Sequence, residues 1–437
     1  MLLLSSSFII FFFLFFWKVE TKFRIVLTPF ILFSAYFILR VVPGFYLGIA
    51  QNEKLEPIFY FVAPIAYFCF AVGYFVVSKG EMLNEYNKLR DFTFSHNDRD
   101  LAVVLFIMVI FIIFGLLMYQ GIPPSINAAY SVANNSIDAS EAGRLVSEAR
   151  REISKGHVFN KDSSSNGVFR EFIFIFGCVF LTSTTAFFLK KNKFSNIFLI
   201  ISLALCYVFV SGDGTRGRFV VVLTSAAIAY SVYKPISLKY TFRIFILLVF
   251  ISIFLGLYTN KMSALLEVGD WEGIFLAIFE RIFIGNSIND SVAIDAFHSG
   301  YLDRPYGYWL FRDLLAFIPG VSSDKPLAYY LYLYEIGGNS TTYLTGTSLS
   351  RAYADGGGVG VVLYFGILGM ICGAAKFLIG LLLKIPSPPI LTFSFLITLL
   401  VGFGQAYVSG LATIIFITSL GLFFFFILRA LFNVKIK

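Results

Sequence analysis

The stretch from Leu101 to Tyr119 has the sequence LAVVLFIMVIFIIFGLLMY and contains no charged residue. A helix needs about twenty apolar residues to cross the hydrocarbon core of a bilayer, so this stretch predicts a transmembrane helix. Apolar stretches of similar kind recur along the whole chain. They predict eleven spans, at residues 2–17, 25–42, 58–78, 101–119, 169–189, 195–211, 218–233, 244–259, 357–383, 391–408 and 411–431.

The composition supports this interpretation. Apolar residues make up 58% of the chain and charged residues 14%, and the mean hydropathy is +0.81. A soluble domain is about half apolar and about a quarter charged, so a bilayer has to cover the surplus of apolar side chains. We therefore predict an all-α polytopic membrane protein with about eleven transmembrane helices, within a range of about ten to twelve.

Several classes of function are disfavoured. The net charge is +8, but the basic residues lie in short clusters beside apolar stretches, which is typical of membrane orientation and not of nucleic-acid binding. The four cysteines form no CxxC pair, so neither a disulfide framework nor a zinc site is expected. The chain has no P-loop, HExxH or GxSxG motif. We predict no metal and no cofactor.

The orientation follows from Lys and Arg in the short connections. Alternate connections and the carboxyl-terminal end hold 18 of the 34 basic residues and 6 of the 26 acidic ones. We expect this side to be cytoplasmic, with the amino terminus periplasmic and the carboxyl terminus cytoplasmic. Among the remaining basic residues Arg outnumbers Lys, 11 to 5, and the planar fork of Arg suits phosphate groups. This bias indicates an anionic ligand on the periplasmic side.

The spans divide the chain into five parts. Residues 1–119 hold the N-terminal transmembrane helices, 120–168 a first periplasmic loop, 169–259 the central helices, 260–356 a large periplasmic loop, and 357–437 the C-terminal helices. The large loop mixes aromatic and apolar stretches with Asp, Arg and Asn. A disordered segment is poorer in aromatics, so we expect a folded helical cap there.

Three segments could carry chemistry. In SGDGTRGR (211–218), glycines allow close approach of a ligand, and Arg216 and Arg218 stand where a helix begins, a position that favours anions. The alternative is a turn whose arginines reach lipid phosphates.

The third segment, Gly346–Gly358, contains Arg351 and leads through a triple glycine into the next span. The alternative for this segment is an i,i+4 pair of Arg351 with Asp355.

The second segment, Asn286–Asp313, supplies both an acid–base group and positive charge. Transfer of a group onto a hydroxyl needs a base, for which we predict Asp290 first and His298 second. It also needs a cation for the departing phosphate, and Arg312 is the candidate. The alternatives are a structural His298 and an Asp313 that only pairs with Arg312 or caps a helix.

The chain resembles the Wzy-type polymerases of oligosaccharide repeat units, the family of the O-antigen and enterobacterial common antigen polymerases. The resemblance rests on Gly214-Thr215-Arg216 before a span, on Arg312-Asp313 with Phe317-Ile318-Pro319 and Lys325-Pro326 after it, and on Thr345–Gly360 opening a span after the large loop. It covers most of the chain in topology.

The resemblance implies an enzyme of the bacterial inner membrane with a GT-C-like, metal-independent glycosyltransferase bundle. Such an enzyme transfers the growing glycan from undecaprenyl pyrophosphate onto a new lipid-linked repeat unit at the periplasmic face. Arg216 and Arg312 would then contact the donor pyrophosphate, supported by Arg218 and Arg351. A Wzz-type chain-length co-polymerase is the expected partner.

Two alternatives remain open. An O-antigen ligase uses similar donor chemistry but attaches the glycan to the lipid A core. A flippase or transporter of lipid-linked oligosaccharide is the second, and it would favour ionisable residues in the middle of spans. Lys376 is the main residue of that kind that we identify in the apolar stretches.

Overall fold

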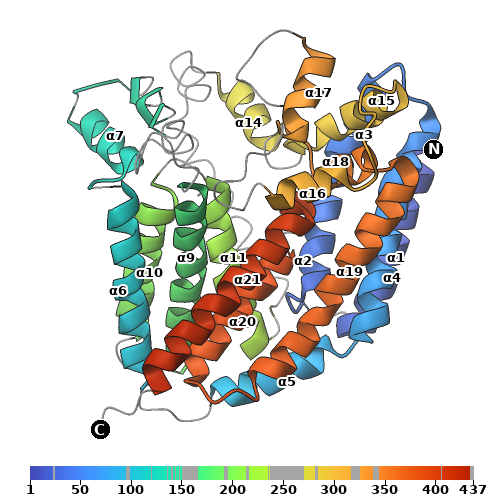
Figure 1. Cartoon of the computed structure of the whole chain (residues 1–437). Coiled ribbons are helices and arrows are strands. Elements are labelled where there is room, and N and C mark those ends of the chain that lie inside the picture. The colour runs from blue at the N-terminus through green and yellow to red at the C-terminus, as the bar shows by residue number, and fades with distance from the viewer. Residues whose placement is uncertain are drawn as a thin grey trace. The chain divides into compact units, whose positions relative to one another are not determined.

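The computed structural model of the chain has only helices as regular elements in the residues that it describes (Figure 1). It describes residues 1–22, 25–94, 99–119, 121–134, 136–138, 141–142, 144–146, 148–149, 166–190, 195–212, 216–234, 236, 270–280, 284–315, 325–337, 344–404 and 406–433. Seven helices within these residues are long and apolar enough to span a membrane, and three more are apolar but shorter. The protein is an all-helical, multi-pass membrane protein.

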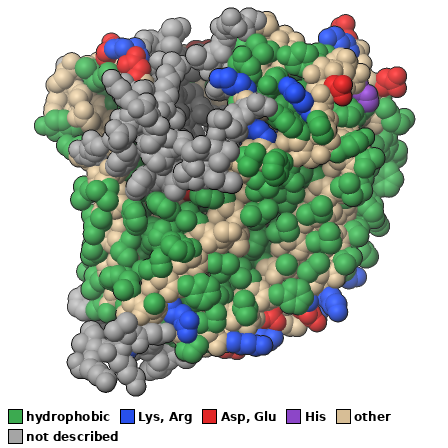
Figure 2. Space-filling view, in the orientation of Figure 1, with side chains coloured by type: hydrophobic (Ala, Val, Ile, Leu, Met, Phe, Trp, Pro, Cys, Tyr) green, Lys and Arg blue, Asp and Glu red, His purple; other side chains and the backbone are tan. Residues whose placement is uncertain are grey.

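The membrane character is visible at the surface. Figure 2 shows hydrophobic side chains over the middles of the helices and charged side chains near the helix ends. Helix α1 (Leu2–Thr21) is an example, because only 11% of the residues in its apolar stretch are buried against protein. Leu3 and Phe11 on this helix are 81% and 62% exposed. Side chains of this kind are stable when lipid covers them.

The described residues contain a helix at ten of the eleven predicted spans, and residues 244–259 lie outside the description. Helices α20 (Pro389–Gly404) and α21 (Ala406–Asn433) lie at the last two predicted spans. Helix α21 includes Ser409 and Gly410, which the prediction placed between these spans.

The chain forms two compact units, and α5 (Met82–Thr93), α20 and α21 contribute residues to both. In the second unit, α9 (Asn166–Leu189) packs against three neighbouring helices, and 89% of the residues in its apolar stretch are buried. This unit contains α6 (Asp100–Tyr119), α7 (Pro124–Ala133), α9 (Asn166–Leu189), α10 (Ser195–Val210), α11 (Arg216–Tyr233) and α14 (Trp271–Phe279).

The first unit combines the amino-terminal helices with the helices around and after the large loop. Its membrane helices are α1, the continuous run α2 (Pro29–Tyr36), η1 (Phe37–Val41) and α3 (Val42–Gln51), then η2 (Pro57–Phe61) with α4 (Val62–Ser78), and α19 (Gly357–Leu382). The second of these runs from Pro29 to Gln51, nine residues beyond the predicted end at residue 42.

Glycines let α4 and α19 approach at backbone distance. A Cβ added at Gly369 would lie 2.1 Å from the Phe70 carbonyl oxygen, and one at Gly373 would lie 2.5 Å from that of Tyr74. Small residues at helix contacts are the usual means of tight packing in membranes. At the far end of α19, the buried Lys376 ammonium donates to the Ser78 carbonyl oxygen at 3.1 Å and so fastens the end of α4.

Four short helices gather where α19 begins (Figure 1). These are α15 (Asp290–His298), preceded by the 3-10 turn η4 (Ser287–Asn289), then α16 (Tyr308–Leu315), α17 (Leu327–Glu335) and α18 (Ser348–Ala354). They share a small core around Trp309, Leu331 and Ala293. We call α15–α18 the helical cap; it positions most of the candidate residues.

Candidate functional site

The helical cap brings two of the predicted arginines together. Arg312 on α16 and Arg351 on α18 both contact the carboxylate of Asp313. The Arg312 Nη1 lies 2.7 Å from Asp313 Oδ1, and the Arg351 Nε lies 3.2 Å from Oδ2. We call Arg312, Asp313 and Arg351 the arginine cluster. Asp313 therefore does pair with its neighbour, as one alternative predicted, and it also joins α16 to α18.

One donor of the arginine cluster remains unused. Arg351 Nη1 is buried and has no hydrogen-bond partner among the residues that the structure describes. A buried donor without an acceptor costs about 1–3 kcal/mol, so an oxygen atom arriving there would be stabilised. The side chain as a whole is 30% exposed, although Nη1 itself is buried.

Asp355 does not form the predicted i,i+4 ion pair with Arg351. Its carboxylate accepts hydrogen bonds from the backbone of α16 instead. Its Oδ1 accepts from the Trp309 amide at 2.7 Å and its Oδ2 from the Leu310 amide at 3.2 Å, the first turn of α16. A carboxylate at this place satisfies amides that have no partner within the helix. The start of α19 thereby fixes the helix that carries Arg312. Burial raises the pKa of Asp355 to about 6, with the Asp313 carboxylate also raising it and the α16 amides lowering it.

The carboxylate of Asp290, the first predicted base, is buried and accepts hydrogen bonds from the protein. It is 1% exposed, and its Oδ1 and Oδ2 accept from the Thr347 amide and hydroxyl, each at 2.7 Å. Burial raises its pKa to about 6, against the lowering effect of the bonds from Thr347 and Ser350. A Cβ at Gly346 would lie 2.7 Å from Asp290 Oδ1. This carboxylate anchors the start of α18, and its geometry gives no support to a role as base.

His298, the second predicted base, is exposed. Its Nε2 is 2.8 Å from the Tyr353 hydroxyl, and its ring centre lies 5.0 Å from that of Phe59. The Tyr353 hydroxyl and the Phe59 ring lie against the imidazole, while the residue as a whole is exposed. Of the two candidates, His298 is the one that an incoming hydroxyl can reach.

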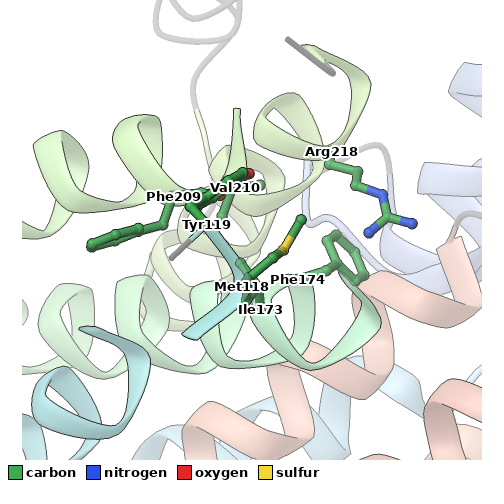
Figure 3. A pocket seen from close by; sticks show the side chains of 7 residues that line it. All are labelled: Met118, Tyr119, Ile173, Phe174, Phe209, Val210 and Arg218. Atoms are coloured by element: carbon green, nitrogen blue, oxygen red, sulfur yellow. The ribbon is translucent and has the colours of Figure 1, made fainter. Parts of the chain in front are cut away.

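Arg218 belongs to the other unit and already has a carboxylate partner. Its guanidinium forms an ion pair with Glu171 and lies 5.9 Å from the centre of the Phe174 ring. It lines a pocket of about 10 Å³ (Figure 3), together with Met118, Tyr119, Ile173, Phe174, Phe209 and Val210. Ligand pockets usually measure about 300–1,000 Å³, so this one is too small for a glycolipid head group.

The turn before α11 is also packed against protein. The Gly212 carbonyl oxygen accepts from the Ser125 amide at 2.9 Å, and a Cβ at Gly212 would lie 2.6 Å from Pro123 Cβ. The glycine at this position serves the contact with the segment before α7. Gly214, Thr215 and the side chain of Arg216 lie outside the described residues, so the predicted role of Arg216 stays a prediction.

Sequence reasoning missed Arg40. This arginine lies inside a membrane-spanning helix run, on the π-helical turn η1, and it is partly buried. The signal was present, because an ionisable residue within an apolar span is rare and usually functional.

In the part of the chain that the structure describes, no group of His, Cys, Asp and Glu is placed to hold a metal ion. Comparisons with protein-family models, with curated proteins and with solved structures found no match.

Proposed function

We propose that the protein polymerises oligosaccharide repeat units linked to undecaprenyl pyrophosphate at the periplasmic face of the bacterial inner membrane. The supporting observation is the arginine cluster, in which two guanidinium groups meet beside the start of a membrane helix and one buried donor has no acceptor among the described residues. Bidentate, charge-assisted hydrogen bonds from Arg are well suited to a diphosphate. The multi-pass bundle supplies the lipid environment for the prenyl chain.

The proposed reaction needs no metal and no nucleotide sugar. A hydroxyl of the acceptor sugar attacks the anomeric carbon of the donor chain, and a bond forms between them. The bond from that carbon to the phosphate oxygen breaks, and undecaprenyl pyrophosphate leaves. Arg312 and Arg351 compensate the negative charge that develops on the departing diphosphate. The hydroxyl proton goes to a base, and His298 is the accessible candidate.

The proposal carries further expectations for the whole molecule. The fold would be a GT-C-like, metal-independent bundle of about eleven spans. The amino terminus and the helical cap would be periplasmic, and the carboxyl terminus would be cytoplasmic. A Wzz-type co-polymerase would set the chain length.

The test uses a strain in which the gene is deleted, complemented with the wild type, with Arg351→Ala or with Arg312→Ala. The matched control is Arg90→Ala, because Arg90 pairs with its neighbour Asp91 on an exposed part of α5. Surface polysaccharide is separated on a gel, and membrane levels of the protein are measured in parallel. We expect a single-repeat band in the deletion strain and in both cluster variants, and a full ladder in the control.

Two outcomes would reject the proposal. Loss of all attached glycan in the deletion strain, with no single-repeat band, would indicate the ligase instead. A full ladder in both cluster variants would remove the arginine cluster from the reaction. Cysteine labelling from the two sides of the membrane gives an independent check, since a cytoplasmic helical cap is incompatible with the proposed chemistry.

A further inference from the structure

Arg40 lies at a place where the helix is altered. Pro43 has no amide hydrogen, so the preceding turn cannot complete its regular hydrogen bonds, and the helix passes through the π-helical turn Phe37–Val41. Turns of this kind are rare and are often found at functional sites. The Ser287 hydroxyl donates to the Arg40 carbonyl oxygen at 2.8 Å and so satisfies a backbone acceptor on this turn.

The segment that leads into the helical cap runs beside this turn and along α3. A Cβ at Gly44 would lie 2.1 Å from Ser287 Oγ, and one at Gly48 would lie 2.4 Å from the Ile288 carbonyl oxygen. The spacing of the two glycines, four residues apart on one helix, allows the segment to approach the α3 backbone directly. The segment then continues into Asp290, which anchors α18 and the residues next to Arg351.

The side chain of Arg40 faces this segment. Gly285 has a φ of +53°, and a Cβ there would lie 2.9 Å from both Nε and Nη2 of Arg40. The missing side chain at Gly285 therefore leaves the space that the guanidinium occupies. Among the described residues no Asp or Glu forms an ion pair with Arg40, whereas Lys376, a cation within another membrane-spanning helix, pairs with Glu81 at 2.9 Å. A partly buried positive charge in a membrane span is costly unless an anion meets it.

We propose that Arg40 binds the phosphate group of a membrane lipid, and that this lipid is the prenyl diphosphate of the proposed reaction. Arg40 offers several hydrogen-bond donors in one plane, and its side chain is partly buried. The bound phosphate lies against the backbone at Gly285, at the end of the segment that leads to the arginine cluster. The identification of the lipid rests on the proposed function, whereas the phosphate site itself does not.

The experiment measures lipid binding to the purified full-length protein in lipid nanodiscs. The probes are undecaprenyl pyrophosphate, phosphatidylglycerol and inorganic pyrophosphate, and the proteins are the wild type, Arg40→Gln and the control Arg90→Gln. We expect Arg40→Gln to weaken binding of undecaprenyl pyrophosphate about tenfold or more, which is the contribution of one or two charge-assisted hydrogen bonds. The control should bind as the wild type does.

Thermal unfolding without added lipid separates a binding role from a structural one. Because no described carboxylate pairs with Arg40, removal of its charge should leave the melting temperature of Arg40→Gln unchanged or raise it. A large decrease in that temperature with unchanged lipid affinity would make Arg40 a structural residue and overturn the proposal.

A second pair of variants leaves the arginine in place. In Gly285→Ala the added Cβ displaces the guanidinium, and lipid affinity should fall. Gly300→Ala is the matched control, because Gly300 also has a positive φ, +75°, but no atom within 4 Å of an added Cβ. Equal lipid affinity in the two glycine variants would also overturn the proposal.

The three probes separate this proposal from the proposed function. Arg40-dependent binding of phosphatidylglycerol, with no binding of undecaprenyl pyrophosphate, would support the lipid phosphate site and reject the polymerase. Binding of undecaprenyl pyrophosphate that is equal in the wild type and in Arg40→Gln would overturn the role of Arg40 and leave the polymerase standing. Binding of inorganic pyrophosphate alone would overturn the lipid assignment.

Discussion

The guanidinium of Arg351 meets the carboxylate of Asp313 with 3.2 Å between Nε and Oδ2, and this contact joins α18 to α16. The same carboxylate pairs with Arg312. One negative charge thus holds two positive ones, and the cluster is suited both to stability and to the capture of an anion. The two roles respond differently when Asp313 is changed.

Asp313→Asn should lower stability and preserve or raise affinity for a diphosphate. The substitution removes the shared partner of two arginines that are 15% and 30% exposed, at a cost of about 1–2 kcal/mol because solvent partly screens them. It also leaves one more positive charge for the ligand. Thermal unfolding and binding of undecaprenyl pyrophosphate measure the two effects. Asp91→Asn is the control, since the exposed Arg90–Asp91 pair should contribute little; a parallel loss of affinity and stability in Asp313→Asn would contradict the ligand role.

Asp290 should make stability depend on pH. Burial raises its pKa from 3.8 to about 6, so the folded chain holds this proton more tightly than the unfolded chain. Its contribution is greatest below pH 4 and is lost as the pH rises through about 6, a change of about 3 kcal/mol. Melting temperatures between pH 4 and pH 7 should fall less in Asp290→Asn than in the wild type. If the melting temperatures of the wild type and of Asp290→Asn fell equally with pH, this account of the carboxylate would be contradicted.

His298→Gln should lower the rate of glycan transfer by about 10²–10⁴, the usual contribution of a general base. Tyr353→Phe removes the hydroxyl beside Nε2 and should cause a smaller loss together with a changed pH–rate profile. Transfer is measured in membranes supplied with lipid-linked repeat units. Asp290→Asn is the informative comparison: full activity there would exclude Asp290 as the base, whereas full activity in His298→Gln would exclude His298.

The contact of α4 with α19 should tolerate alanine at one glycine and not at another. A Cβ at Gly369 would lie 2.1 Å from the Phe70 carbonyl oxygen, whereas one at Gly366 meets no atom within 4 Å. Gly369→Ala should therefore cost about 1–3 kcal/mol through overpacking. Gly366→Ala should be neutral or stabilising by up to about 1 kcal/mol, because alanine favours the helix. The melting temperatures of the purified variants test this prediction, and equal melting temperatures would contradict the backbone contact.

The sequence predicts the membrane helices well because hydropathy over about twenty residues depends on local composition alone. It predicts their ends poorly where composition is ambiguous. The span that begins at Pro29 continues to Gln51, through Pro43, Gly44 and Gly48, residues that usually end or weaken a helix in water. Here the glycines pack against the segment before α15, and this contact cannot be read from the helix itself.

The candidate site is predicted only in part for the same reason. Arg312 and Asp313 are neighbours in sequence, so their pairing could be anticipated. The partnership of Asp313 with Arg351, and of Asp355 with the first amides of α16, joins residues that lie far apart along the chain. The predicted base Asp290 is drawn into the same framework by Thr347. Residue type indicated charge chemistry, but only tertiary structure separates the anchors from the accessible groups.

The glycine contact between α4 and α19 also limits how the first unit can move. Two helices whose backbones touch, and whose far ends are fastened by Lys376 at the Ser78 carbonyl oxygen, cannot slide or roll past one another without steric overlap. The two helices therefore move together as one rigid body. Any bending within the first unit must therefore occur elsewhere, and the turn at Phe37–Val41 with its irregular hydrogen bonding is the place where we expect it.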